Sequence, residues 1–365
     1  MRSSDLRRDV GQLLIMGFTG VEATSTLRAL LRTLAPGGII LFARNITGAE
    51  QTHEFLAECQ EVLDTPLFRC VDLEGGTVDR LRNVVAHAPA AAEVFATGDP
   101  RLFRRHGRVI GEEVRALGFN VDFAPTLDLA FPASRNVLTT RVVSSRPEAV
   151  AGYARQFLGG LADARVLGCG KHFPGLGEAA LDTHKELPAV AKPWDALWRE
   201  DLAPYRELRR ELPFVMVAHA AYPKVTRDRR PASLSKKWMT DILRKKIGYD
   251  GLIVSDDLEM GGVLAASSIG EAAVETLRAG ADMFLVCHNE EAVQQTWDAV
   301  LTAAERDRKL ARHIAQSARR VRQAKRKWKL SARLPAPPSE RTVEKLRWSV
   351  LEFRRACEAA AAQRL

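Results

Sequence analysis

A carboxylate and an imidazole stand two residues apart in Asp182-Thr183-His184. They follow Lys171-His172-Phe173-Pro174-Gly175, a basic pair and then residues that break regular structure. In such a pair the carboxylate can accept a hydrogen bond from one ring nitrogen, which leaves the other nitrogen to transfer protons near neutral pH. Asp182 and His184 are therefore candidate acid/base residues. Because a lone Asp-x-His is common in polar loops, this assignment depends on the rest of the chain.

The elements that must position this pair can be read from hydrophobic runs. Several short runs are apolar throughout, as expected for parallel strands that are covered on both faces. They span residues 12–18, 37–43, 67–72, 121–125, 164–170, 213–219, 251–256 and 282–287. Helical patterns lie between nearly all of them and after the last, at 24–33, 49–63, 101–117, 147–161, 194–208, 235–247, 269–279 and 290–304. This alternation predicts an α/β protein with a single (β/α)8 TIM-type barrel rather than an open doubly wound sheet.

The end of the chain departs from the repeat. We predict one barrel domain over residues 1–330, followed over 331–365 by a Pro-rich joint, Pro335-Ala336-Pro337-Pro338, and a C-terminal helical extension. A basic helix is predicted over 306–329, with an apolar stripe at Leu310, Ile314 and Val321. Aromatic residues are few there and no nucleic-acid motif accompanies it, so we interpret it as a solvated face and expect no nucleic-acid partner.

Composition sets the class of protein. The chain has 365 residues, 46% hydrophobic and 27% charged, with a formal net charge of +9, and these proportions are typical of a soluble globular protein. No apolar run approaches the roughly 18 residues that span a bilayer, and no signal peptide is recognisable, so we expect a cytoplasmic protein without a membrane partner. Five scattered cysteines without Cys-x-x-Cys support neither a disulfide framework nor a zinc ribbon.

Ionisable residues collect where the predicted strands end, which is where barrels of this kind place their active sites. From the third strand onward these residues are Asp72 and Glu74, Asp128 and Arg141, Lys171 and His172, His219, Asp256 and Asp257, and His288 with Asn289. Hydrogen-bonding groups of both signs at one rim suit a polyhydroxylated ligand such as a sugar.

Three of these motifs resemble the family 3 glycoside hydrolases, and more closely the bacterial β-N-acetylglucosaminidase (β-hexosaminidase) branch. They are Lys171 to Gly175 with Asp182-x-His184, Ser255-Asp256-Asp257-Leu258, and Asp72-x-Glu74-Gly75-Gly76, within a similarity over roughly residues 10 to 330. The resemblance implies a retaining exo-β-N-acetylglucosaminidase that acts in peptidoglycan recycling and needs neither metal nor cofactor. Its expected partner is a muropeptide that contains N-acetylglucosamine, and it is expected to act as a monomer or weak dimer.

The resemblance also implies residue roles. Asp256 matches the catalytic nucleophile, and Asp182 with His184 matches the acid/base dyad of this branch. The residues that match contacts to the sugar hydroxyls and acetamido group are Asp72, Arg80, Arg141, Lys171 and His172, and His219 matches a strand-end histidine near the site.

The chemistry of retaining glycosidases agrees with these roles. They need a nucleophile on one face of the anomeric carbon and a proton donor on the other, and they pass through a covalent glycosyl-enzyme. Asp256 at a strand end suits the first task, and His184 on a loop suits the second. Because successive strand residues point to opposite sides, we expect only one of Asp256 and Asp257 to face the barrel mouth, and the resemblance favours Asp256.

The chain departs from the family pattern at Leu176, Thr77 and Glu259, where His, Arg and a small residue are usual. These departures leave the leaving-group preference open. Within the family, a β-glucosidase or a glycosyl phosphorylase is the alternative. Outside it, the alternatives are a non-catalytic sugar-binding barrel and a metal-dependent hydrolase with His172, His184, His219 and Asp256 as ligands.

Overall fold

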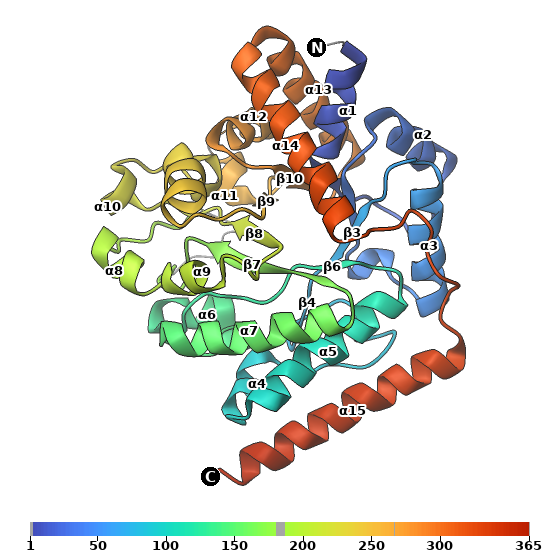
Figure 1. Cartoon of the computed structure of the whole chain (residues 1–365), viewed down its shortest axis with the longest axis vertical. Helices are drawn as coiled ribbons and strands as arrows, with labels where there is room; N and C mark the ends of the chain where they lie inside the picture. The colour runs from blue at the N-terminus through green and yellow to red at the C-terminus, as the bar shows by residue number, and fades with distance from the viewer. Residues whose placement is uncertain (1–2, 180–186, 266, 365) are drawn as a thin grey trace.

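The fold is a closed barrel of parallel strands surrounded by helices (Figure 1). The computed structural model describes residues 3–179, 187–265 and 267–364. Within these ranges eight strands close in the order β1-β10-β9-β8-β7-β6-β3-β2. Their bounds are β1 Leu14–Met16, β2 Gly38–Ile40, β3 Phe68–Val71, β6 Val121–Asp122, β7 Leu167–Phe173, β8 Phe214–Val217, β9 Leu252–Asp257 and β10 Met283–Val286. The predicted (β/α)8 TIM-type barrel is confirmed.

Helices cover the outside of the barrel and short ones shape its loops. Their bounds are α1 Ser3–Gln12, α2 Ser25–Leu34, α3 Ala49–Glu61, α4 Ala91–Ala96, α5 Pro100–Ala116, α6 Arg135–Leu138, α7 Pro147–Asp163, α8 Trp194–Arg199, α9 Ala203–Leu208, α10 Pro223–Thr226, α11 Gly261–Leu264, α12 Ile269–Ala279, α13 Glu290–Arg306, α14 Arg308–Lys327 and α15 Glu340–Ala362. Between β8 and β9 the covering helix is η5 (Lys237–Lys246), which has π-helical hydrogen bonding. Helix α12 shows how the sequence sets such bounds, because Ser268 and Glu271 form a capping box at its start and Gly280 ends it in the left-handed conformation.

Aromatic side chains and a buried lysine fill the N-terminal end of the barrel. Trp328, just beyond α14, lies with its ring centroid 6.3 Å from that of Phe68 and 5.8 Å from that of Phe214. Lys325 of α14 is buried, with Nζ 5.1 Å from the Phe68 ring centroid, and it donates a 2.9 Å hydrogen bond to Oε1 of Gln12. Helix α14 therefore covers this end of the barrel interior.

The predicted basic helix is confirmed as α14. Leu310, Ile314 and Val321 are buried as its apolar stripe requires, while Arg312 and Arg319 are exposed on the other face.

Several predicted elements have different bounds. The fifth strand, predicted over 164–170, runs over Leu167–Phe173, so Lys171 and His172 lie within its last residues. The first strand begins only at Leu14, because α1 continues through Gln12. The single helix predicted over 194–208 is two helices, α8 and α9. Pro204 lacks the N–H that would bond to the carbonyl of Glu200, so the helix breaks between them. An unpredicted antiparallel ribbon, β4 (Leu73–Gly75) and β5 (Val78–Asp79), follows β3.

The C-terminal helix α15 packs against α5 and α4, as the red helix in Figure 1 shows. The Phe353 ring stacks on His106, with centroids 5.6 Å apart, and Arg105 pairs with Glu352 at 3.1 Å. The domain boundary near residue 330 stays a prediction. Among the described residues, no helix combines the length and apolarity that crossing a membrane requires.

Candidate active site

A cavity of about 280 Å³ opens at the carboxyl ends of the strands. The residues that line it lie far apart in sequence, and they meet because parallel strands bring their carboxyl ends to one rim. Its wall contains six of the predicted site residues, namely Asp72, Arg80, Arg141, Lys171, His172 and Asp256. The structure therefore brings this set together.

A buried network of ion pairs forms one side of the cavity. Nζ of Lys171 lies 2.7 Å from Oδ1 of Asp72 and 2.6 Å from Oε1 of Glu74. Arg141 donates two parallel hydrogen bonds of 2.8 Å to the Glu74 carboxylate, from Nε and Nη2. Burial acts to raise the pKa of Glu74, but Arg141 and Lys171 outweigh it and hold this pKa well below its usual range. Glu74 is thus an ionised anchor for both cations, and both are fixed before a ligand arrives.

Sequence reasoning noted Glu74 at a strand end but did not assign it to the site. Its side chain is only 4% exposed and does not line the cavity, so it acts through Lys171 and Arg141. The sequence did offer one indication, because Glu74 stands two residues after Asp72, which was already a candidate site residue.

His172 is held in one orientation by Asp128. Nδ1 of His172 lies 2.7 Å from Oδ2 of Asp128, and the carboxylate also accepts a 2.7 Å hydrogen bond from the amide of Leu176. Nε2 of His172 faces Nη2 of Arg141 at 3.4 Å. Since Arg141 can only donate, the neutral ring with its proton on Nδ1 satisfies both contacts.

Asp256 lies at the end of β9, half-buried in the cavity wall. Its Oδ1 accepts a 2.9 Å hydrogen bond from the amide of Asp257, and within the described ranges Oδ2 has no protein donor. Burial acts to raise the pKa of Asp256, but at the acidic pH where this carboxyl titrates, the charges of protonated His219 and His172 and the hydrogen bond from the Asp257 amide lower the pKa below its ordinary value. The carboxylate is therefore ionised, with one oxygen available to the cavity.

Asp257 also touches the cavity, so the expectation that only one of the two aspartates faces the mouth is wrong. Strand alternation is interrupted there, because the register of β9 against β10 shifts between Val254 and Asp257. Its oxygens are occupied by other groups: Oδ2 lies 3.2 Å from Nε2 of His288, and Oδ1 accepts a 3.1 Å hydrogen bond from the amide of Glu259. Asp257 thus supports the loop, while one oxygen of Asp256 has no donor among the residues that the structure describes.

His219 lies behind the strand end and outside the cavity wall. Its Nε2 is 2.8 Å from the carbonyl oxygen of Asp257, and its Nδ1 is 2.6 Å from Oγ of Ser233. A carbonyl only accepts, so Nε2 carries the proton and the Ser233 hydroxyl donates to Nδ1. Burial lowers the pKa of His219, consistent with this neutral form. The contacts position the Asp256–Asp257 turn, and a direct contact to sugar stays a prediction.

Phe42 is a part of the cavity that the sequence did not indicate. Its ring lies 5.3 Å from that of His288, at an interplanar angle of 28°, and the guanidinium carbon of Arg80 is 5.8 Å from its centroid. Nε of Arg80 is buried and has no hydrogen-bond partner among the described residues. A lone aromatic after β2 gives no signal in the sequence, because only the fold brings it beside residues from β10.

The three departures from the family pattern occupy different places. Leu176 is buried in the cavity wall, and Thr77 is exposed at the β4–β5 turn. Oε2 of Glu259 accepts hydrogen bonds from the amides of Cys287, at 2.7 Å, and His288, at 2.5 Å. Glu259 thus anchors the end of β10, a task that a small residue could not perform.

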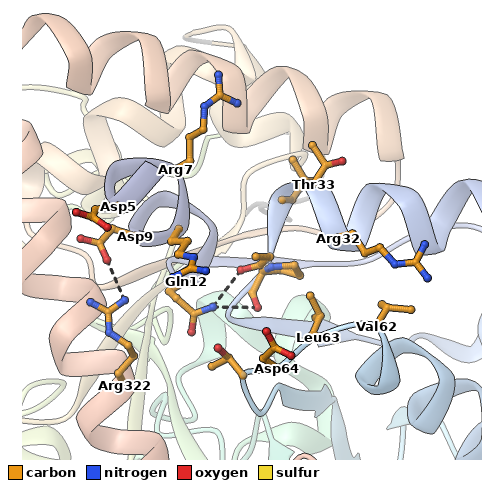
Figure 2. Close-up of a pocket in the computed structure, with 15 residues that line it drawn as sticks. Asp5, Arg7, Asp9, Gln12, Arg32, Thr33, Val62, Leu63, Asp64 and Arg322 are labelled. Atoms are coloured by element: carbon orange, nitrogen blue, oxygen red, sulfur yellow. Dashed lines mark hydrogen bonds and ion pairs between the residues drawn. The ribbon is translucent and has the colours of Figure 1, made fainter. Parts of the chain in front are cut away.

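Asp182 and His184 lie outside the described residues. Within the described ranges, no three side chains of His, Cys, Asp or Glu gather as metal ligands. A larger hollow of about 670 Å³ lies at the N-terminal end of the barrel, between α1, α2 and α14. Figure 2 shows it lined by Asp and Arg side chains, with Asp9 paired to Arg322 at 2.8 Å. None of the predicted site residues lies in this hollow.

Comparisons with known proteins agree on one family. The profile described as "Glycosyl hydrolase family 3 N terminal domain" matches residues 5–324. A β-hexosaminidase of Alkalilimnicola ehrlichii is 38% identical over 287 residues, which cover 77% of this chain and 82% of that protein. The solved structure of a family 3 β-N-acetylglucosaminidase from Paenibacillus sp. has a TM-score of 0.89 at 35% identity, covering 95% of this chain and 68% of that one. NagZ of Neisseria gonorrhoeae, solved with N-trifluoroacetyl-D-glucosamine, has a TM-score of 0.71 at 32% identity, covering 84% and 97%.

Proposed function

The chain belongs to glycoside hydrolase family 3 and is a hydrolase of the β-hexosaminidase type, and from this premise we propose that it is a retaining exo-β-N-acetylglucosaminidase. The observation that carries the proposal is the ionised Asp256 in the wall of a small cavity, beside a preformed set of hydrogen-bonding groups. A volume of about 280 Å³ is at the small end of ligand sites and suits a single sugar ring.

Asp256 is the proposed nucleophile. The free Oδ2 attacks the anomeric carbon and forms a covalent glycosyl-Asp256, while the leaving oxygen takes a proton. The lowered pKa supports this role, because only the carboxylate is nucleophilic. Its amide contact to Asp257 and the support from His219 hold it in one orientation.

His184 and Asp182 are the proposed acid/base dyad. His184 protonates the departing oxygen and then takes a proton from the water that attacks the glycosyl-enzyme, so the anomeric configuration is retained. Asp182 orients the ring and stabilises its protonated form.

Sugar recognition is proposed for Asp72, Arg80, Arg141, Lys171 and His172. The pairs from Lys171 to Asp72 and from Arg141 to Glu74 fix donors and acceptors before the sugar binds, which lowers the entropy lost on binding. His219 supports this set from behind β9.

The proposed biological role is peptidoglycan recycling in the cytoplasm, with N-acetylglucosamine removed from muropeptides by a monomer or weak dimer. The β-hexosaminidase relatives support N-acetylglucosamine as the sugar that is removed, and they do not indicate which aglycone it is removed from. Residues 331–365 are proposed to be a helical extension of the barrel domain at 1–330.

The test is turnover of 4-nitrophenyl β-N-acetylglucosaminide by the wild type and by Asp256→Ala. The wild type should release nitrophenol and Asp256→Ala should not, while both show the same circular dichroism spectrum. Faster turnover of the matching glucoside would favour a β-glucosidase, and turnover that requires phosphate would favour a phosphorylase. A folded wild type without turnover of any of these would favour a binding protein.

A further inference from the structure

A buried lysine joins the two described arms of the chain between β7 and α8. The side chain of Lys192 is 4% exposed, and its Nζ lies 2.5 Å from Oε2 of Glu200 and 2.7 Å from Oδ2 of Asp201. It also lies 3.5 Å from Oε1 of Glu178 and 4.3 Å from the ring centroid of Phe131. Glu178 belongs to the arm that leaves β7, and Lys192 to the arm that leads into α8. A single ammonium therefore connects both arms to the α8–α9 junction.

The outgoing arm is seated directly on Asp201. Gly175 has φ +133°, and a Cβ there would come within 2.8 Å of Cβ of Asp201. The Tyr222 hydroxyl donates a 2.7 Å hydrogen bond to the Gly175 carbonyl. A Cβ on Gly177 would come within 2.6 Å of the Leu129 carbonyl oxygen. Only glycine permits these close approaches, so the two glycines allow the backbone of this arm to pack directly against Asp201 and Leu129.

The returning arm is fixed by the backbone. The amide of Ala221 donates to the carbonyl of Pro188 at 2.9 Å, and the amide of Val190 donates to the carbonyl of Ala221 at 2.8 Å. Val190 is 1% exposed. This arm is therefore tied to the segment after β8 just before it reaches Lys192.

The charge of Lys192 matters because one of its carboxylate partners, Asp201, is poorly solvated. Asp201 is 2% exposed, and burial raises the pKa of its carboxyl to about 6 even with the ammonium beside it. Burial acts to lower the pKa of Lys192, but Asp201 and Glu200 outweigh it and raise this pKa. Removal of the ammonium would leave Asp201 buried without a counter-charge, directly beneath Gly175.

We propose that Lys192 is a positioning residue for proton transfer, because it holds Glu178 and Asp201 together and so fixes both arms that flank Asp182 and His184 in the sequence. This inference rests on the proposed acid role of His184. A displacement of about 1 Å in a catalytic group can cost on the order of 100-fold in rate. The loss should appear only where protonation of the leaving group limits the reaction.

The experiment compares kcat/KM of the full chain on phenyl and 4-nitrophenyl β-N-acetylglucosaminides. Lys192→Met should lose on the order of 100-fold on the phenyl substrate and less than about threefold on the nitrophenyl substrate, which needs little protonation. Lys192→Arg should recover most of the loss, because it keeps the charge. If Lys192→Met does not fold, Lys192→Met/Asp201→Asn leaves no unpaired buried charge and takes its place.

Two controls separate the possible failures. Lys325→Met removes another buried lysine, at the opposite end of the barrel, and should affect both substrates equally. His184→Ala should show the same selective loss as Lys192→Met. Equal losses on both substrates in Lys192→Met, beside a selective His184→Ala, would overturn the role of Lys192 and leave the proposed function intact. A non-selective His184→Ala would overturn the acid assignment, and the inference about Lys192 with it.

Discussion

Replacement of Glu74 by glutamine should destabilise the fold and weaken catalysis together. The carboxylate is buried and accepts two hydrogen bonds from Arg141 and one contact from Lys171. A glutamine keeps one acceptor oxygen and turns its NH2 toward Arg141, which donates to both oxygens and cannot accept. About two charge-assisted hydrogen bonds are lost, at roughly 1.5–3 kcal/mol each. The expected cost is therefore about 3–6 kcal/mol, which overlaps the range of about 3–5 kcal/mol for breaking a buried ion pair.

Glu113 provides a matched control, because it is also a buried glutamate but its pKa is shifted in the opposite direction, toward the neutral form. Neither of its oxygens has a hydrogen-bond partner among the described residues. Burial, with Asp79 and Asp122 nearby, raises its pKa well above the usual range, so the carboxyl is protonated at neutral pH. Glutamine resembles a protonated glutamate, so Glu113→Gln should change stability by less than about 1 kcal/mol.

The assay is urea unfolding at pH 7 together with kcat/KM on 4-nitrophenyl β-N-acetylglucosaminide. Glu74→Gln should lower both the free energy of unfolding and kcat/KM, the latter because Lys171 and Arg141 lose their anchor. Glu113→Gln should resemble the wild type in both. Equal effects of the two substitutions, or an unchanged Glu74→Gln, would refute the assignment of Glu74 as an ionised anchor.

Two further predictions concern other buried groups. Burial lowers the pKa of Lys325 to about 7 from an ordinary value near 10.5, so the unfolded chain binds more protons between these values and stability should fall as pH falls toward 7. Lys325→Met should remove up to about 1.4 kcal/mol per pH unit from the slope of unfolding free energy between pH 7 and pH 9, and an unchanged slope would contradict a buried, largely neutral lysine. His219→Ala should lower kcat by about 10- to 100-fold with little change in KM, because the Asp256–Asp257 turn loses its support. A rise in KM with kcat unchanged would instead indicate that His219 contacts the sugar directly.

The barrel and most of its rim could be predicted from the sequence for one physical reason. Parallel strands buried on both faces are mostly apolar, so the first ionisable residue after each apolar run lies at or near the carboxyl end of a strand. Asp72, Lys171 and Asp256 were found in this way, and the fold brings them into one cavity wall.

Other features required three-dimensional contacts. Glu74 acts through the cations that it holds, and Phe42 matters only because β2 and β10 are both neighbours of β1. Asp257 touches the cavity where the register of β9 against β10 shifts, an irregularity that strand alternation in the sequence could not reveal. The break between α8 and α9 could have been predicted from Pro204, but the helical pattern on both sides of this proline favoured a single helix.

The covalent intermediate gives the most direct test of the central claim, that Asp256 carries the nucleophilic oxygen. A fluorinated N-acetylglucosaminyl fluoride forms the glycosyl-enzyme faster than it is hydrolysed, so the labelled peptide can be located by mass spectrometry after digestion. The account predicts one sugar per chain, attached to Asp256 and absent in Asp256→Ala. A label on Asp257, or wild-type enzyme that turns over the substrate without ever carrying a label, would contradict it.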